Sequence, residues 1–130
     1  MKRNIVVLCI LAILLVISLC EELLVRDTTK QLNTYTNALQ ISMQNNNTEL
    51  DTKEVLDNFD NLKLYWDNKK NQICFFANYD KIRYMDESLI KLNDALQNND
   101  SALANENLSA VKSFYSLIQY VMGFNINNLF

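Results

Sequence analysis

The hydrophobic positions of the chain begin with an unbroken run near the N-terminus. From residue 5 to residue 19 the sequence has no charge, no Gly and no Pro, and Ser18 is its one clearly polar residue. A helix of that length spans about 22 Å, which is short for a hydrocarbon core of about 30 Å. Residues 23–25 extend the apolar character beyond two glutamates, so a longer span is feasible. We therefore expect residues 1–25 to form an uncleaved membrane anchor.

Two other interpretations of this segment stay open. Residues 17–19 before Cys20 resemble a lipobox, which predicts a lipoprotein acylated at Cys20, although the residue before that cysteine is normally small. Ordinary secretion requires an A-x-A-like cleavage site of small residues, and residues 16–19 offer no such site. Lys2 and Arg3 are the only charges ahead of the run. The positive-inside rule then predicts a single-pass protein of the cell membrane with a cytoplasmic N-terminus and an extracytoplasmic domain.

Beyond the anchor, apolar residues recur at the three- and four-residue spacing of an α-helix. The first set predicts that the anchoring helix continues as a stalk until the cluster Asn45–Asn47. A second helix is expected from Asp51, which forms an acidic variant of a capping box with Glu54, to near Ala77. The two apolar faces consist of Leu24, Thr28, Leu32, Tyr35, Leu39 and Met43, and of Val55, Phe59, Leu62, Trp66, Ile73 and Phe76.

Two further helices are expected downstream, joined by a short turn. Asn78 or Asp80 is the expected N-cap of the first, residues 98–101 separate it from the second, and Gly123 is the expected C-cap of the second. Because so short a turn reverses the chain, the pair is expected to form an antiparallel αα-hairpin. The apolar positions follow an a/d spacing and comprise Ile82, Met85, Leu89, Leu92 and Leu96, then Leu108, Val111, Tyr115, Ile118 and Met122.

These elements predict an all-α fold, with an N-terminal transmembrane helix followed by an antiparallel bundle of about four helices over residues 26–123. Shifting the second helix by 52 residues superimposes its apolar positions on those of the fourth, which indicates two related αα-hairpins in a short TPR-like stack. An apolar tail, residues 124–130, follows. Because exposed apolar residues are costly in water, Asn128, Leu129 and Phe130 are expected to fold back over the bundle or to contact a partner membrane protein or the bilayer.

Charge balance and missing residue types restrict the chemistry. The chain has 12 basic and 15 acidic residues. Without Lys2 and Arg3, 10 basic residues stand against those 15 acidic ones, which disfavours binding to nucleic acid. The sequence has no His, no glycine-rich phosphate loop and no EF-hand loop, so we expect no enzymatic activity, no metal site and no cofactor. Cys9, Cys20 and Cys74 lack paired spacing and are expected to be small buried hydrophobic residues.

Aromatic residues are densest around the single Trp. Trp66 follows Tyr65 and precedes Phe75, Phe76 and Tyr79. Such a cluster can line a ligand cleft or form a contact for a partner. Trp66 falls on the apolar face of the second helix, which favours packing in the core.

The order of these features is similar to that of a known family. The features on which this similarity rests are the N-terminal anchor, the segment 62–68 (LKLYWDN), the turn at residues 75–80, the amphipathic hairpin and the terminal residues 128–130 (NLF). The chain resembles the uncharacterised bacterial family numbered 4363 among the domains of unknown function. The resemblance implies a short protein with one N-terminal membrane helix, from Gram-positive and often spore-forming bacteria, and it implies no established activity.

Three positions depart from that family's pattern, and one of them is Leu129, because the tail reads N-L-F where the family has N-I-F. The family typically carries W-x-x-N, and here Trp66 is followed by Asn68, with Lys69 at the fourth position. Its His in the interhelical turn corresponds to Asn78, which can do no acid–base or metal chemistry at neutral pH. Either this member has lost such a role, or the position is a capping or hydrogen-bonding group in the family, and we favour the second.

Together these patterns favour one function over an alternative. We expect a non-enzymatic, single-pass, membrane-anchored accessory protein whose extracytoplasmic helical domain binds another membrane or envelope protein. Its candidate partner contacts are Trp66, Tyr79, Asn128, Leu129 and Phe130. The alternative is a ligand-sensing or ligand-binding four-helix module at the membrane surface, which predicts a roomy apolar cavity around Trp66 and Tyr79.

Overall fold

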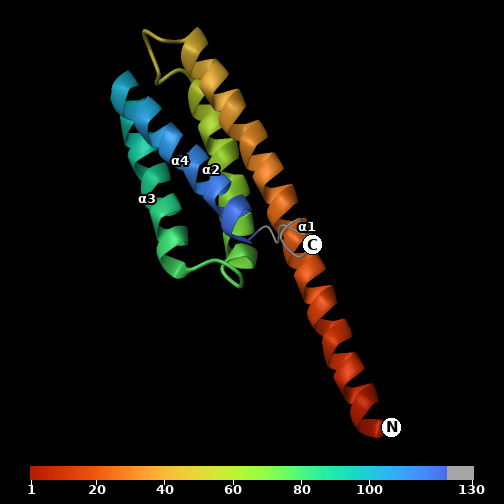
Figure 1. The fold of residues 1–130 in the computed structure, drawn as a ribbon. Coiled ribbons are helices and arrows are strands. Elements are labelled where there is room, and N and C mark those ends of the chain that lie inside the picture. The colour runs from red at the N-terminus through yellow and green to blue at the C-terminus, as the bar shows by residue number, and fades with distance from the viewer. Residues whose placement is uncertain (123–130) are drawn as a thin grey trace.

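The computed structural model describes residues 1–122, which form four α-helices and contain no strand (Figure 1). They are α1 (Lys2–Asn45), α2 (Lys53–Ile73), α3 (Tyr79–Gln97) and α4 (Ser101–Met122). α1 pairs with α2 and α3 pairs with α4 as two antiparallel αα-hairpins, and α1 also packs along α4. The predicted all-α class and the two hairpins are confirmed.

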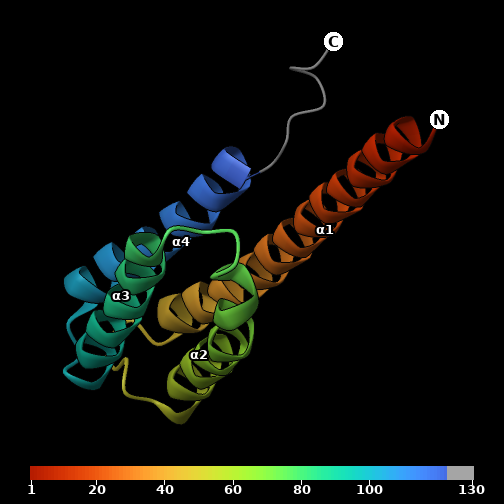
Figure 2. The same ribbon diagram turned by 90° about the horizontal axis from the view of Figure 1, so that it is seen from below.

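α1 is one continuous helix whose two halves have different surroundings. Its N-terminal half projects beyond the bundle, whereas its C-terminal half forms one wall of the bundle (Figures 1 and 2). The helix continues to Asn45, as predicted from its spacing. The part that was expected to be a stalk is therefore packed, and its buried residues are Val25, Thr28, Thr29, Leu32, Thr36, Leu39, Ser42 and Met43.

The core lies between the four apolar faces that the spacing predicts. Every predicted face residue of α3 is buried, and so are those of α4 as far as Ile118. In α2 the predicted face is buried from Val55 to Ile73, and Phe76 in the following loop packs against it. The predictions for the side chain of Met122 and for Gly123 as a C-cap lie outside the described residues. The hairpin spacing therefore identified which side of each helix packs inward.

The start of α2 differs from the prediction by one residue. The side chain of Thr52, rather than that of Asp51, accepts a hydrogen bond from the backbone N–H of Val55 at 3.4 Å. The backbone of Thr52 is extended, as an N-cap requires. Glu54, the expected capping-box partner, instead accepts a hydrogen bond from the side chain of Asn46 at 3.1 Å.

α2 also ends earlier than predicted, at Ile73 instead of near Ala77. The carbonyl of Ile73 accepts hydrogen bonds from the N–H groups of both Phe76 and Ala77, at 2.9 and 2.8 Å. This tight turn leads directly into Asn78, whose side chain accepts from the N–H of Asp80 at 3.0 Å. Of the two predicted N-caps of α3, Asn78 is the one used, and the capping role expected at this position is confirmed.

Asn99 joins the two loops at the far end of the bundle. Its φ of 54° lies in the left-handed region, which Asn tolerates better than most residues. Its side-chain oxygen accepts hydrogen bonds from the backbone N–H groups of Leu50 at 2.6 Å and Asp51 at 3.2 Å. Asp100 then caps α4 by accepting from the N–H of Leu103 at 3.0 Å. The α1–α2 and α3–α4 connections are thus held together.

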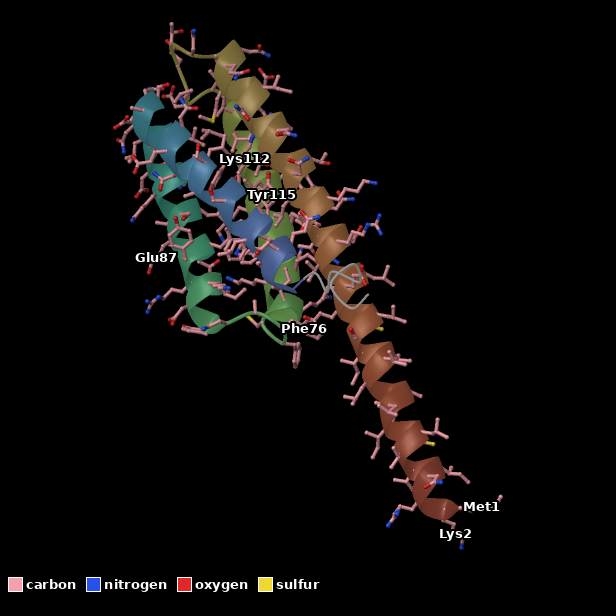
Figure 3. All side chains as sticks on the ribbon, in the orientation of Figure 1. Met1, Lys2, Phe76, Glu87, Lys112 and Tyr115 are labelled. Atoms are coloured by element: carbon pink, nitrogen blue, oxygen red, sulfur yellow. The ribbon has the colours of Figure 1, made fainter. Side chains whose placement is uncertain are left out.

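A polar seam aligns α4 with α1. The hydroxyl of Tyr115 donates to Asn33 at 3.1 Å and lies 3.2 Å from the hydroxyl of Thr36. The ammonium group of Lys112 donates to the side chain of Gln40. Figure 3 labels Lys112 and Tyr115 in the middle of the bundle. Because a buried hydroxyl without a partner is costly, these bonds favour one register between the two helices.

Candidate functional site

The base of the bundle is the end from which the N-terminal half of α1 projects. It is formed by the α2–α3 loop (residues 74–78), by Tyr79 at the start of α3, and by the last turns of α4 (Figures 1 and 2). Figure 3 labels Phe76 at this end. Gln119 of α4 lines a shallow pocket together with Val25 of α1. The base therefore lies where α1 enters the bundle.

Trp66 is a core residue in the middle of α2. Its side chain is 0% exposed, and its indole packs edge to face on Phe114 of α4, with ring centroids 5.4 Å apart. The indole Nε1–H donates to Asp86 of α3 at 2.6 Å. Core packing, one of the three interpretations of this residue, is confirmed. The side chain has no exposed surface to offer a partner.

A chain of charged groups extends from Asp86 along α2. The Nζ of Lys70 lies 3.3 Å from Asp86 and 3.2 Å from Asp67, which also pairs with Lys63. Burial by itself raises the pKa of Asp67, but the hydrogen bonds and charges of the two lysines outweigh it and leave this pKa below its usual range. Burial lowers the pKa of Lys70, yet Asp67 and Asp86 together raise it above its usual range. The network links α2 to α3.

The other candidate contacts are not gathered around Trp66. Tyr79 is 72% exposed at the base, whereas Trp66 lies seven residues, or about 10 Å, before the end of α2. The two therefore do not surround a common cavity. Asn128, Leu129 and Phe130 lie outside the described residues.

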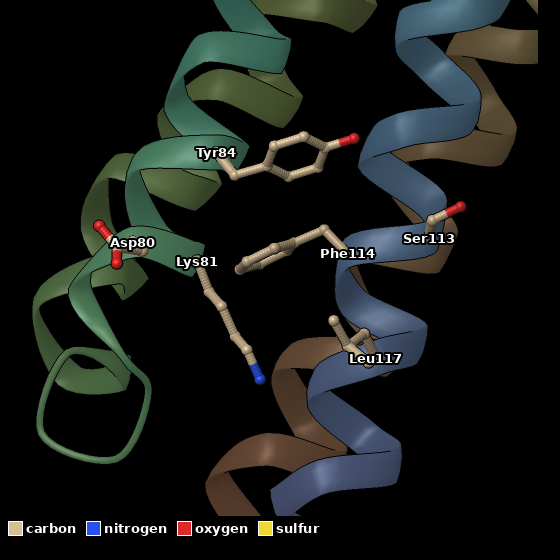
Figure 4. A pocket seen from close by; sticks show the side chains of 6 residues that line it. All are labelled: Asp80, Lys81, Tyr84, Ser113, Phe114 and Leu117. Atoms are coloured by element: carbon tan, nitrogen blue, oxygen red, sulfur yellow. The ribbon is translucent and has the colours of Figure 1, made fainter.

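A groove between α3 and α4 was missed in the sequence. Its volume is about 360 Å³, and it is lined by Asp80, Lys81, Tyr84, Ser113, Phe114 and Leu117. In Figure 4, Tyr84 and Lys81 from α3 and Phe114 and Leu117 from α4 extend into the gap between the two helices. Apolar side chains thus form most of the groove, with one ammonium group at its edge.

The signal for this groove lay in residues outside the a/d spacing. Tyr84 and Leu117 are large apolar residues that fall between the predicted core positions of their helices, and both are exposed. Exposed single hydrophobic residues are common on soluble proteins. The sequence alone does not say that these two meet across a helix pair.

The cysteines contradict the expectation of burial. Cys9, Cys20 and Cys74 are all exposed. The first two lie on the projecting half of α1, which has no packing partner in the bundle, and Cys74 lies in the α2–α3 loop. In the part of the chain that the structure describes, no group of three or more His, Cys, Asp or Glu residues is placed to hold a metal ion.

The fold places this chain in the class of small helical bundles that are built on a long N-terminal helix. Of the helices in residues 1–122, α1 is the one long and apolar enough to cross a membrane, by length and composition. The comparison with protein families matches residues 22–129 to the family described as Domain of unknown function (DUF4363). The chain belongs to this family, and the resemblance inferred from its motifs is confirmed. The comparisons with curated proteins and with solved structures found no match.

Proposed function

We propose that the protein is a non-enzymatic accessory protein, anchored in a bacterial membrane by α1, whose helical bundle binds another protein of the envelope. The projecting half of α1 carries the proposal. Its large aliphatic side chains are each 50–66% exposed, on a surface that the bundle does not reach. They are Ile5, Val6, Val7, Leu8, Ile10, Leu11, Ile13, Leu14, Leu15, Val16, Ile17 and Leu19.

The free energy of this exposure supports a membrane. Full burial of one such side chain is worth about 1.5–3 kcal/mol, so moving the whole half-exposed set from water into lipid gains on the order of 10–20 kcal/mol. That is comparable to the total stability of a typical domain, about 5–15 kcal/mol. A helix that continues into the bundle without interruption then holds the bundle at the membrane surface.

The proposed orientation has a cytoplasmic N-terminus, since Lys2 and Arg3 precede the apolar run. Trypsin added to intact cells is then expected to digest the bundle, and a bundle left intact there while digested in lysed cells would reverse the orientation. The lipoprotein alternative predicts incorporation of labelled palmitate that Cys20→Ser abolishes. With an uncleaved anchor, Cys20→Ser changes the mass only by the exchange of sulfur for oxygen and leaves the membrane localisation unchanged.

The groove between α3 and α4 is the surface proposed for the envelope partner. It offers apolar walls from Tyr84, Phe114 and Leu117 and a charge from Lys81, the combination of an apolar centre and a polar rim that protein interfaces use. Membrane anchoring restricts the partners to proteins within reach of the same bilayer.

The test is site-specific photo-crosslinking in native membranes. A photoreactive amino acid at Leu117, in the groove, is expected to give an adduct larger than the protein itself, and mass spectrometry then identifies the second protein. The matched control is the same amino acid at Ile90, which is exposed on α3 but does not line the groove. Recovery of the uncrosslinked chain alone from both positions contradicts the proposal.

The ligand-binding alternative is favoured by one observation, the size of the same groove. About 360 Å³ is at the lower end of the range for small-molecule sites. An amphiphilic dye such as anilinonaphthalene sulfonate is then expected to bind the folded bundle at one site. This binding is expected to be lost in the variant Leu117→Asp. Dye binding that is unchanged by Leu117→Asp contradicts this alternative.

A further inference from the structure

The base of the bundle carries three highly exposed aromatic side chains from three different segments. Phe75 lies in the α2–α3 loop, Tyr79 begins α3 and Tyr120 lies near the end of α4. They are 87%, 72% and 85% exposed. Apart from Met1, the large hydrophobic residues described in the structure include none that is more exposed. The most exposed aromatic rings of the bundle thus lie together at its base.

Two contacts place this end beside the last residues of the apolar run. The rings of Tyr35 on α1 and Tyr65 on α2 lie 5.2 Å apart. α2 continues for eight residues from Tyr65 to Ile73, about 12 Å, and the antiparallel α1 covers the same distance back from Tyr35 to Asp27. On α4, Gln119, the neighbour of Tyr120, lies beside Val25.

The base therefore lies within about one helical turn of Val25, the last residue of the apolar extension at residues 23–25. The polar interfacial layer on each side of a bilayer is roughly 5–8 Å thick. When the anchor spans the hydrocarbon core as far as Val25, the three rings fall in this layer. Arg26 of α1 reaches the same level, and Glu21 and Glu22 lie about 4–6 Å deeper, from where their side chains extend toward the charged headgroups and water that can solvate them.

We propose that the base of the bundle docks on the bilayer that α1 crosses, with Phe75, Tyr79 and Tyr120 inserted among the lipid headgroups. Tyr is enriched at this depth because its ring is apolar and its hydroxyl stays hydrated. The inference rests on the membrane anchoring in the proposed function, and it adds a second, peripheral lipid contact to it. Asp80 and Lys81 directly follow Tyr79, so the charges beside the rings have both signs and zwitterionic lipid is a sufficient partner.

The experiment measures depth with a fluorescent reporter in a purified system. The full chain with Cys9→Ser and Cys20→Ser is labelled at Cys74 with an environment-sensitive dye and reconstituted in phosphatidylcholine vesicles that contain no other protein. Cys74 is exposed and adjoins Phe75, so the aromatic residues stay in place. The dye is expected to be quenched by lipids with a nitroxide near the headgroup and to be shielded from iodide in the water.

Labels at two control positions distinguish a failure of the membrane anchor from a failure of the docking. Each uses Cys74→Ser together with Cys9→Ser and Cys20→Ser, and introduces the label through Ile13→Cys in the apolar run or through Thr48→Cys in the loop at the opposite end of the bundle. The label at position 13 is expected to be quenched by nitroxides deep in the acyl chains. The label at position 48 is about 30 Å above the base and is expected to be quenched by iodide alone.

The combined variant Phe75→Ser, Tyr79→Ser and Tyr120→Ser tests the aromatic rings themselves. These side chains are exposed, so the helical content measured by circular dichroism is expected to be unchanged, while the label at Cys74 loses its lipid quenching. Lipid quenching that persists in this variant overturns the role of the rings. Iodide quenching at Cys74 equal to that at position 48, with lipid quenching kept at position 13, overturns the docking and leaves the anchor intact. Iodide quenching at all three positions refutes the anchor as well.

Discussion

Asp86→Ala is expected to lower the free energy of unfolding of the bundle by about 2–4 kcal/mol. Asp86 connects the two hairpins, because it accepts a hydrogen bond from the indole of Trp66 at 2.6 Å and lies 3.3 Å from Lys70. Both partners belong to α2, and Asp86 belongs to α3. Removing the carboxylate leaves a core N–H group without its acceptor.

The magnitude follows from the two contacts. A hydrogen bond to a charged group contributes about 1.5–3 kcal/mol, and the short distance from Nε1 to the carboxylate is typical of such bonds. The pair with Lys70 is about one-third exposed on both sides, so it adds only roughly 0.2–1 kcal/mol. Asp86→Asn keeps an acceptor but not the charge, and is therefore expected to cost about half as much.

The assay is urea unfolding of the full chain in mild detergent, followed by far-ultraviolet circular dichroism. Asp94→Ala on the same helix is the matched control, because Asp94 is exposed and surface substitutions usually change stability by less than about 0.5 kcal/mol. An unchanged slope with a lowered midpoint identifies a change in stability. If Asp86→Ala and Asp94→Ala have the same midpoint, the hydrogen bond to the indole contributes nothing and the reasoning is refuted.

Three further predictions can be checked with the same unfolding assay. Asn99→Ala is expected to lower the free energy of unfolding by about 2–4 kcal/mol, because it removes two hydrogen bonds and places Ala at a positive φ. Asn99→Gly is expected to lower it by less, because Gly tolerates that φ. Tyr115→Phe removes the hydroxyl from the polar seam and is expected to lower the free energy of unfolding by about 1–3 kcal/mol. An unchanged urea midpoint would contradict this. The folded-state pKa of Asp67 is lowered by Lys63 and Lys70 against the effect of burial, so its stabilisation is present above its ordinary pKa of 3.8 and is lost as the pH falls through the folded value. The stability difference between the protein and Asp67→Asn should therefore shrink below about pH 4, and a difference independent of pH between 7 and 2 would refute this assignment.

The sequence predicted the helices and their buried faces because period-3.6 spacing reports directly which side of a helix is removed from water. It placed the face of α3, and that of α4 as far as Ile118, at the residues found buried, and it led to the family. The predicted ends of α2 were less accurate than its predicted face. Thr52 and Asp51 are both good N-caps, and the choice between them depends on where the loop from Asn46 brings the chain.

Contacts between helices could not be predicted in the same way. The bond from Trp66 to Asp86 and the pair of bonds from Asn99 depend on how the two hairpins pack together, which no spacing within one helix specifies. The groove beside Leu117 lies within one hairpin, and it depends on how α3 and α4 pack against each other, which the spacing within either helix does not specify. The cysteines were misjudged because free Cys is usually buried, while Cys9 and Cys20 lie on a surface that only lipid is proposed to cover.

The uninterrupted course of α1 has a mechanical consequence for the bundle it carries. No loop or glycine separates the apolar run from the segment that ends at Asn45, so in the proposed membrane-anchored state the helix behaves as a lever with its lower arm in the bilayer. The upper arm, from Val25 to Asn45, is about 30 Å long. A change of 20° in helix tilt, which lies within the range that bilayer thickness imposes, then swings its tip by about 10 Å parallel to the membrane plane.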